Sequence, residues 1–169
     1  RWVSYWKRGC FINNINLGLS LRKIYTVSLN KTITKVITTT NLGLVTTRNY
    51  DNASLAKIDV KDISNLSIKV VYNIELENTG FYPGYIFKVN DYIPDGMAFN
   101  PNDPLNKDWE LVEDGYLVNR SLANDLIYGG EKRNITLSLD IIRKEAGSFI
   151  NYASVEDEDL QILGGVSYE

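Results

Sequence analysis

Apolar and polar residues alternate with a period of two along several stretches of this chain, and this pattern restricts its fold more than any other feature. The clearest examples are residues 25–37, 66–78 and 133–142, with further examples at 84–93 and 148–155. Successive side chains of a β-strand point to opposite faces, so this alternation predicts strands with one buried face. No stretch of 11 or more residues shows convincing helical periodicity.

Turn-forming residues separate the predicted strands. Gly, Pro, Asn and Asp gather at residues 78–80, 82–84, 94–96, 100–104, 113–115 and 129–131. Short strands joined by such turns predict an all-β fold, in the form of an antiparallel β-sandwich. Residues 41–47 and 54–61 are weaker strand candidates, and we expect them to form a β-hairpin inserted after the first strand.

Composition excludes several kinds of site. The chain of 169 residues contains no histidine and a single cysteine, Cys10, so it cannot form a Ser-His-Asp triad or an intrachain disulfide. The net charge of −3 comes without a basic cluster, which argues against nucleic acid as a partner. No apolar run reaches the ~18 residues of a membrane-spanning helix, so we expect no membrane insertion in this segment.

The two ends of the chain differ in character from its centre. We expect residues 1–22 to be an exit strand and linker from a preceding domain, and residues 23–159 to be one β-sandwich repeat domain. Residues 160–169 are expected to be a linker or the start of a following segment. Because the chain does not begin with Met, it is interpreted as a segment of a longer protein.

Three polar residues occupy inward positions of the predicted strands. Lys31 interrupts the apolar row of the first strand, Asp91 continues the inward row of a central strand, and Asn151 stands in the inward row of the last. Each has an ordinary structural explanation. A Lys near a strand end reaches water, an Asp caps a turn, and an Asn satisfies backbone groups at a sheet edge.

Taken together, however, an amine, an acid and an amide in one core define a reaction. Burial disfavours the charged form of an amine, and a neutral amine is a nucleophile. A carboxyl group in the same pocket is pushed toward its protonated form and can donate a hydrogen bond to the amide oxygen, which activates the carbonyl carbon. Attack by the Lys then releases ammonia and leaves a Lys–Asn isopeptide bond. The reaction needs no cofactor and occurs once per molecule, so we expect no turnover enzyme.

Residues 72–100, "YNIELENTGFYPGYIFKVNDYIPDGMAFN", resemble the repeat domains of Gram-positive, especially clostridial-type, cell-surface proteins and of fimbrial and collagen-adhesin-like proteins. The similarity continues through "LNKDW", "SLANDLI" and "INYASVEDED". The resemblance implies an immunoglobulin-like, collagen-adhesin-like β-sandwich. It also implies an extracellular location on the bacterial surface, anchored to the cell wall through regions outside this segment.

Many members of this family carry an isopeptide bond between a Lys on the first strand and an Asn on the last, assisted by an acidic residue on a central strand. The positions that match are Lys31 and Asn151 for the bond and Asp91 for the acidic residue. The resemblance implies that Asp91 is the catalytic proton donor and acceptor. Lys57 and Lys35 are the alternative lysines. The alternation places Lys57 on the polar face of its segment. It places Lys35 on the inward face of the first strand, four residues after Lys31.

The resemblance implies a structural stalk or repeat module of an adhesin, with neighbouring domains of the same chain as its partners. The alternative is a ligand-binding adhesin domain that recognises a host matrix protein or a glycan. The 11 tyrosines keep this alternative open, because exposed tyrosines build recognition surfaces. A contiguous exposed aromatic patch favours binding, and a uniformly polar surface favours a spacer.

Overall fold

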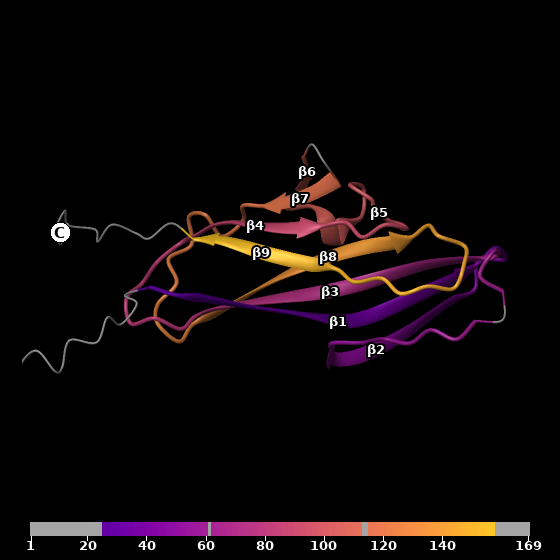
Figure 1. The fold of residues 1–169 in the computed structure, drawn as a ribbon, viewed down its shortest axis with the longest axis horizontal. Coiled ribbons are helices and arrows are strands. Elements are labelled where there is room, and N and C mark those ends of the chain that lie inside the picture. Colours follow the sequence, from indigo (N-terminus) through magenta and orange to yellow (C-terminus); the bar gives the residue numbers. More distant parts are fainter. Residues whose placement is uncertain (1–24, 61, 113–114, 158–169) are drawn as a thin grey trace, which may run out of the picture.

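The computed structural model describes residues 25–60, 62–112 and 115–157. Within these residues the chain forms two antiparallel β-sheets that face each other (Figure 1). The predicted all-β, two-sheet architecture is confirmed. Residues 1–22, which contain Cys10 and were predicted to be an exit strand and linker, lie outside the described residues. So do residues 160–169, which were predicted to be a linker or the start of a following segment.

The larger sheet contains the longest strands. Its strand order is β2-β1-β3-β8-β5. β1, β3 and β8 correspond to the three clearest alternating stretches of the sequence. The bounds are Val45–Ala53 for β2, Val27–Thr40 for β1, Leu66–Asn78 for β3, Lys132–Ile141 for β8 and Met97–Phe99 for β5.

The smaller sheet has the strand order β6-β7-β4-β9. Its strands are Trp109–Leu111 (β6), Tyr116–Asn119 (β7), Ile86–Tyr92 (β4) and Tyr152–Asp157 (β9), and a 3₁₀ turn, Pro104–Asn106 (η2), precedes β6. β9 begins at Tyr152 rather than at residue 148 as its alternation predicts. Tyr152 pairs with Tyr92, the last residue of β4, so residues 148–151 have no neighbour on β4 to pair with.

The region after β1 differs from the expected inserted hairpin. β2 pairs with β1, and residues 54–60 form no strand. The turn between the strands contains Gly43 at a φ of 83°, a left-handed conformation that glycine adopts without strain. The structure therefore pairs β2 with the first strand rather than with the residues that follow it.

Side chains also cover part of the edge of β8. The Nδ2 of Asn106 donates to the carbonyl of Ser138 at 3.0 Å, and its Oδ1 accepts from the Ser138 N–H at 2.8 Å. The Nε1 of buried Trp109 donates to the carbonyl of Thr136 at 2.7 Å. Free backbone groups on an edge invite pairing with other chains, and these bonds replace a neighbouring strand.

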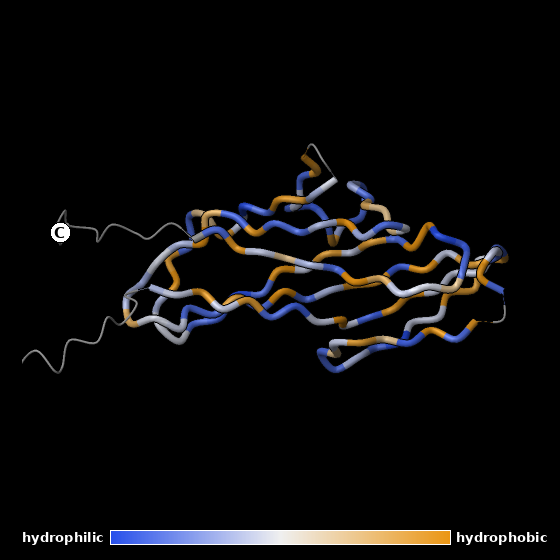
Figure 2. Tube along the Cα trace, viewed as in Figure 1, coloured by the Kyte–Doolittle hydropathy of each residue, from blue (hydrophilic) through white to orange (hydrophobic). Residues whose placement is uncertain are grey.

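The core lies between the inward faces of the two sheets, and Figure 2 shows the alternation of hydrophobic and hydrophilic residues along the long strands. Leu76, Leu117 and Leu137 are fully buried there. Removing such a side chain from water stabilises the fold by about 1.5–3 kcal/mol. The carboxyl group of Asp91 is equally inaccessible to solvent, although it is the kind of group that burial penalises most.

The described chain enters and leaves the sandwich at the same end. β1 runs away from that end and β9 runs back toward it, so the start of β1 and the end of β9 lie at one end of the long axis (Figure 1). Tension applied through these two points would separate β1 and β9 from that end inward.

Candidate functional site

Lys31 and Asp91 meet between the two sheets. Lys31 lies on β1 in the larger sheet and Asp91 lies on β4 in the smaller one. The Nζ of Lys31 donates a hydrogen bond to Oδ2 of Asp91, and the two side chains are 9% and 0% exposed. The alternation predicted only that each of these residues lies on the inward face of its own strand. The structure shows that the two side chains are in contact.

Asn151 reaches the same region from the start of β9. Asp91 pairs with Ala153 across β4 and β9, and Asn151 lies two residues before Ala153. Both polar atoms of the Asn151 side chain are buried without a hydrogen-bond partner, and so is Oδ1 of Asp91. Such atoms are rare in folded proteins because each one costs free energy. Within the described residues, three of the five unpartnered buried side-chain atoms belong to these two residues.

Burial shifts both titratable groups toward their neutral forms. Desolvation lowers the pKa of Lys31 from its ordinary 10.5 and outweighs the attraction of the Asp91 charge. Desolvation likewise raises the pKa of Asp91 above its ordinary 3.8, against the opposing effects of Lys31 and of a contact from Asn151. Proton transfer from Lys31 to Asp91, which gives a neutral amine and a carboxylic acid, is favoured by this environment.

Tyr72 on β3 closes another side of the cluster. It is a diagonal neighbour of Lys31 on the inner face of the larger sheet, and the Lys31 Nζ lies 4.6 Å from the centre of its ring. Burial raises the pKa of Tyr72 to about 12, the Asp91 charge adds to this effect, and a contact from Asn151 opposes it. Sequence reasoning missed Tyr72 as a site residue. The only available signal was a hydroxyl in an otherwise aliphatic inward row.

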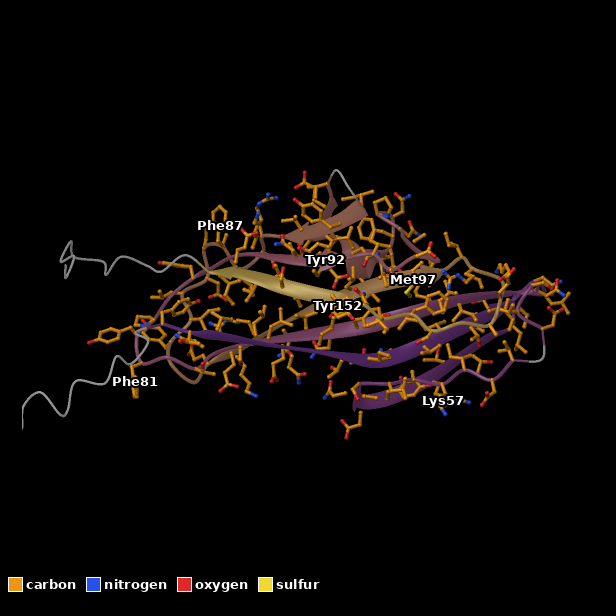
Figure 3. The ribbon with its side chains drawn as sticks, in the orientation of Figure 1. Lys57, Phe81, Phe87, Tyr92, Met97 and Tyr152 are labelled. Atoms are coloured by element: carbon orange, nitrogen blue, oxygen red, sulfur yellow. The ribbon has the colours of Figure 1, made fainter. Side chains whose placement is uncertain are left out.

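The two alternative lysines lie elsewhere. A β-bulge between Ile33 and Lys35 shifts the register, so that Val36 is buried and Lys35 is exposed. The inward parity predicted for Lys35 is therefore wrong, because a bulge inserts an extra residue that alternation cannot register. Lys57 is exposed within residues 54–60, and Figure 3 shows it well away from Tyr152 at the start of β9.

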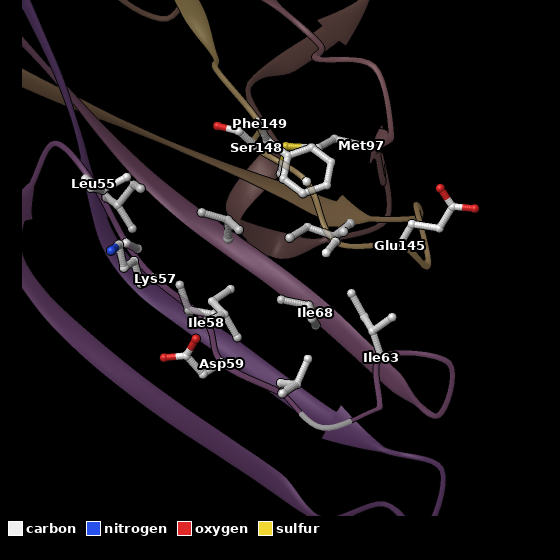
Figure 4. A pocket seen from close by; sticks show the side chains of 18 of the residues that line it. Leu55, Lys57, Ile58, Asp59, Ile63, Ile68, Met97, Glu145, Ser148 and Phe149 are labelled. Carbon is white, nitrogen blue, oxygen red and sulfur yellow. The ribbon is translucent and has the colours of Figure 1, made fainter.

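An apolar pocket of ≈ 950 Å³ adjoins the cluster (Figure 4). Its lining includes the inner face of β1 and β3, residues 55–60 and residues 145–149, and Tyr72 contributes to its wall. Its two acidic residues, Asp59 and Glu145, lie on opposite sides of the space in Figure 4. They do not converge on one point, as paired-carboxylate chemistry requires.

A second Lys–Asp contact provides a comparison within the same molecule. Lys69 donates to Asp103, but the Lys69 side chain is 30% exposed. Asp103 also accepts from the N–H of Leu105 and the hydroxyl of Ser138. Burial raises the pKa of Asp103, yet these hydrogen bonds outweigh it and the pKa is lowered. Lys69 and Asp103 form an ordinary ion pair, whereas the environment of Lys31 and Asp91 disfavours both charges.

No protein-family model matches this chain, and no curated protein or solved structure matches it either. In the part of the chain that the structure describes, no helix has the length and apolar character needed to cross a membrane. The chemistry of the chain is therefore inferred from the buried cluster itself.

Proposed function

We propose that this chain is a structural module of a bacterial cell-surface adhesin or wall protein, with an immunoglobulin-like sandwich tied by an isopeptide bond between Lys31 and Asn151. One observation carries the proposal. A buried amine contacts a buried carboxyl group whose free oxygen, like the nearby amide of Asn151, has no partner. The surface location and the stalk role are supported by the resemblance of residues 72–100 to surface-protein repeats.

The chemistry needs only these side chains. Asp91 takes a proton from the Lys31 ammonium, and the neutral Nζ attacks Cγ of Asn151. A second proton moves from the attacking nitrogen through Asp91 to Nδ2, the Cγ–Nδ2 bond breaks, and ammonia leaves. One proton of the original ammonium remains on Asp91, and the new amide joins Nζ to Cγ. The burial of Lys31 and Asp91 favours the reaction, because it holds the reacting groups together and limits the access of water to them.

The position of the bond suits resistance to force. It would join β1 in the larger sheet to the start of β9 in the smaller one. Since the described chain enters and leaves at one end, tension peels β1 and β9 until it reaches the bond (Figure 1). Residues 32–150 lie beyond that point and would carry no load.

Single-molecule pulling through handles attached at residues 25 and 157, the ends of the described segment, tests this function. With the bond intact only residues 25–31 and 151–157 extend, which gives about 50 Å at ~3.4 Å per residue. Lys31→Ala should instead release roughly 130 residues, or about 450 Å. Lys69→Ala is the matched control and should keep the short extension. A wild-type chain that releases the long extension contradicts the proposal.

A row of tyrosines favours the alternative function, in which the domain recognises a host matrix protein or a glycan. Tyr116, Tyr92 and Tyr152 stand opposite one another across β7, β4 and β9. Tyr92 and Tyr152 are 49% and 64% exposed, so their rings are available to a ligand. Binding to immobilised matrix proteins and glycans, lost in Tyr92→Ser with Tyr152→Ser, would support this role. Wild-type protein that binds none of them contradicts it.

A further inference from the structure

Four polar groups in the cluster lack a strong partner, and their hydrogen-bonding types are complementary. Oδ1 of Asp91 is an acceptor, and the Asn151 amide offers one donor nitrogen and one acceptor oxygen. None of these three atoms makes a hydrogen bond of normal geometry, but Asn151 lies close enough to oppose the rise in the pKa of both Asp91 and Tyr72. The hydroxyl of Tyr72 is a donor whose bond goes to the Met97 sulfur at 3.9 Å, a weak acceptor. The set therefore supplies one acceptor for the amide nitrogen and one donor for the amide oxygen.

We propose that Tyr72 donates a hydrogen bond to Oδ1 of Asn151 during isopeptide formation, while Oδ1 of Asp91 accepts from Nδ2. This assignment rests on the proposed function and adds a second group that acts on the amide. Asp91 already holds Lys31 through Oδ2 and must pass a proton to the leaving nitrogen. Its carboxyl group is therefore not free to polarise the carbonyl oxygen as well, and the Tyr72 hydroxyl takes that role.

The surroundings of Tyr72 suit a donor to developing negative charge. Its ring centre lies 4.6 Å from the Lys31 Nζ. Asn151 is also close enough to the Tyr72 hydroxyl to influence its pKa, so the hydroxyl lies beside the reacting amide. With a pKa of about 12, the phenol keeps its proton at neutral pH. Loss of one such donor from an acyl-transfer site slows the reaction by about 10²–10³-fold.

The test compares Tyr72→Phe with the wild type in refolding experiments. The 169-residue chain is recovered unreacted in denaturant and diluted to start folding. Aliquots are then quenched in acid, and the loss of ammonia is followed by mass. We expect Tyr72→Phe to fold at the wild-type rate, monitored by circular dichroism, and to cross-link roughly 100-fold more slowly or worse. Met97→Leu, which removes only the weak sulfur acceptor, is the matched control and should react at nearly the wild-type rate.

A second measurement applies even if Tyr72→Phe folds poorly. 3,5-Difluorotyrosine at position 72 keeps the ring and the hydroxyl but loses its proton at lower pH. The ratio of its cross-linking rate to the wild-type rate should fall as this phenol ionises. A ratio that ignores this ionisation, or a folded Tyr72→Phe that reacts as fast as wild type, overturns the role of Tyr72 alone. Wild-type protein that never loses ammonia overturns the proposed isopeptide bond and this role with it.

Discussion

If Lys31 and Asn151 are joined by the proposed bond, the effects of substituting them on the free energy of unfolding are strongly coupled. A double-mutant cycle measures this coupling directly. Lys31→Met and Asn151→Ala each abolish the bond, so combining them removes nothing further of that kind. Two residues that merely pack near each other would instead lose stability almost additively. The coupling free energy between the two substitutions therefore reports the covalent tie.

The magnitude follows from the loop that the bond closes. The tie spans about 120 residues, for which the chain-entropy treatment of a cross-link gives a stabilisation of about 5 kcal/mol at 25 °C. Each single variant and the double variant should lose about this amount. At about 3–4 °C per kcal/mol for a domain of this size, the melting temperature falls by about 15–20 °C.

Urea denaturation followed by circular dichroism supplies the free energies of unfolding for all four proteins. A coupling of about 5 kcal/mol is expected from the loop estimate. Losses that add within about 0.5 kcal/mol would refute the reasoning. Lys69→Met with Asp103→Ala is the matched cycle for a non-covalent Lys–Asp contact. Because Lys69 is partly exposed, its coupling should be about 1 kcal/mol or less.

Three further predictions follow from the same geometry. Asp91→Asn removes the proton relay, so refolded protein should keep its full sequence mass for hours, and cross-linking at the wild-type rate would contradict the role of Asp91. The wild-type reaction needs a neutral Lys31 amine and a protonated Asp91 carboxyl group. Because the pair loses this state at both low and high pH, the plot of rate against pH should be bell-shaped. Since burial raises the pKa of Asp91 above 3.8 and lowers that of Lys31 below 10.5, the rising and the falling part of the profile should both lie between these pH values. A flat profile would contradict this. Asn106→Ala leaves the Ser138 N–H unpaired and should cost about 2–3 kcal/mol in urea denaturation, whereas a loss below about 0.5 kcal/mol would show that the edge needs no cover.

Much of the sandwich could be predicted from local pattern. β3 covers residues 66–78, the stretch that alternation selects, because one of its faces packs against the core along its whole length. The inward positions of Lys31 and Asp91 followed from the same rule. Their direct contact across the two sheets did not follow from alternation, because that pattern assigns faces within a strand and says nothing about which strands oppose each other.

The remaining features depend on neighbours. The start of β9 is determined by where β4 ends, and the exposure of Lys35 is determined by a bulge in β1. The local sequence pattern indicates neither feature. β5, β6 and β7 contain only three or four residues each, too few to show a period. Tyr72 looks like any aromatic residue in an apolar row until Lys31 and Asn151 are placed beside it.

Intact mass spectrometry of the folded, purified wild-type chain tests the central claim most directly. The bond between Lys31 and Asn151 predicts a mass about 17 Da below that of the sequence, the mass of the ammonia that its formation releases. A proteolytic digest should contain a branched peptide that joins these two residues, and Lys31→Ala should have the full mass of its own sequence. Mature wild-type protein at its full sequence mass would contradict the account.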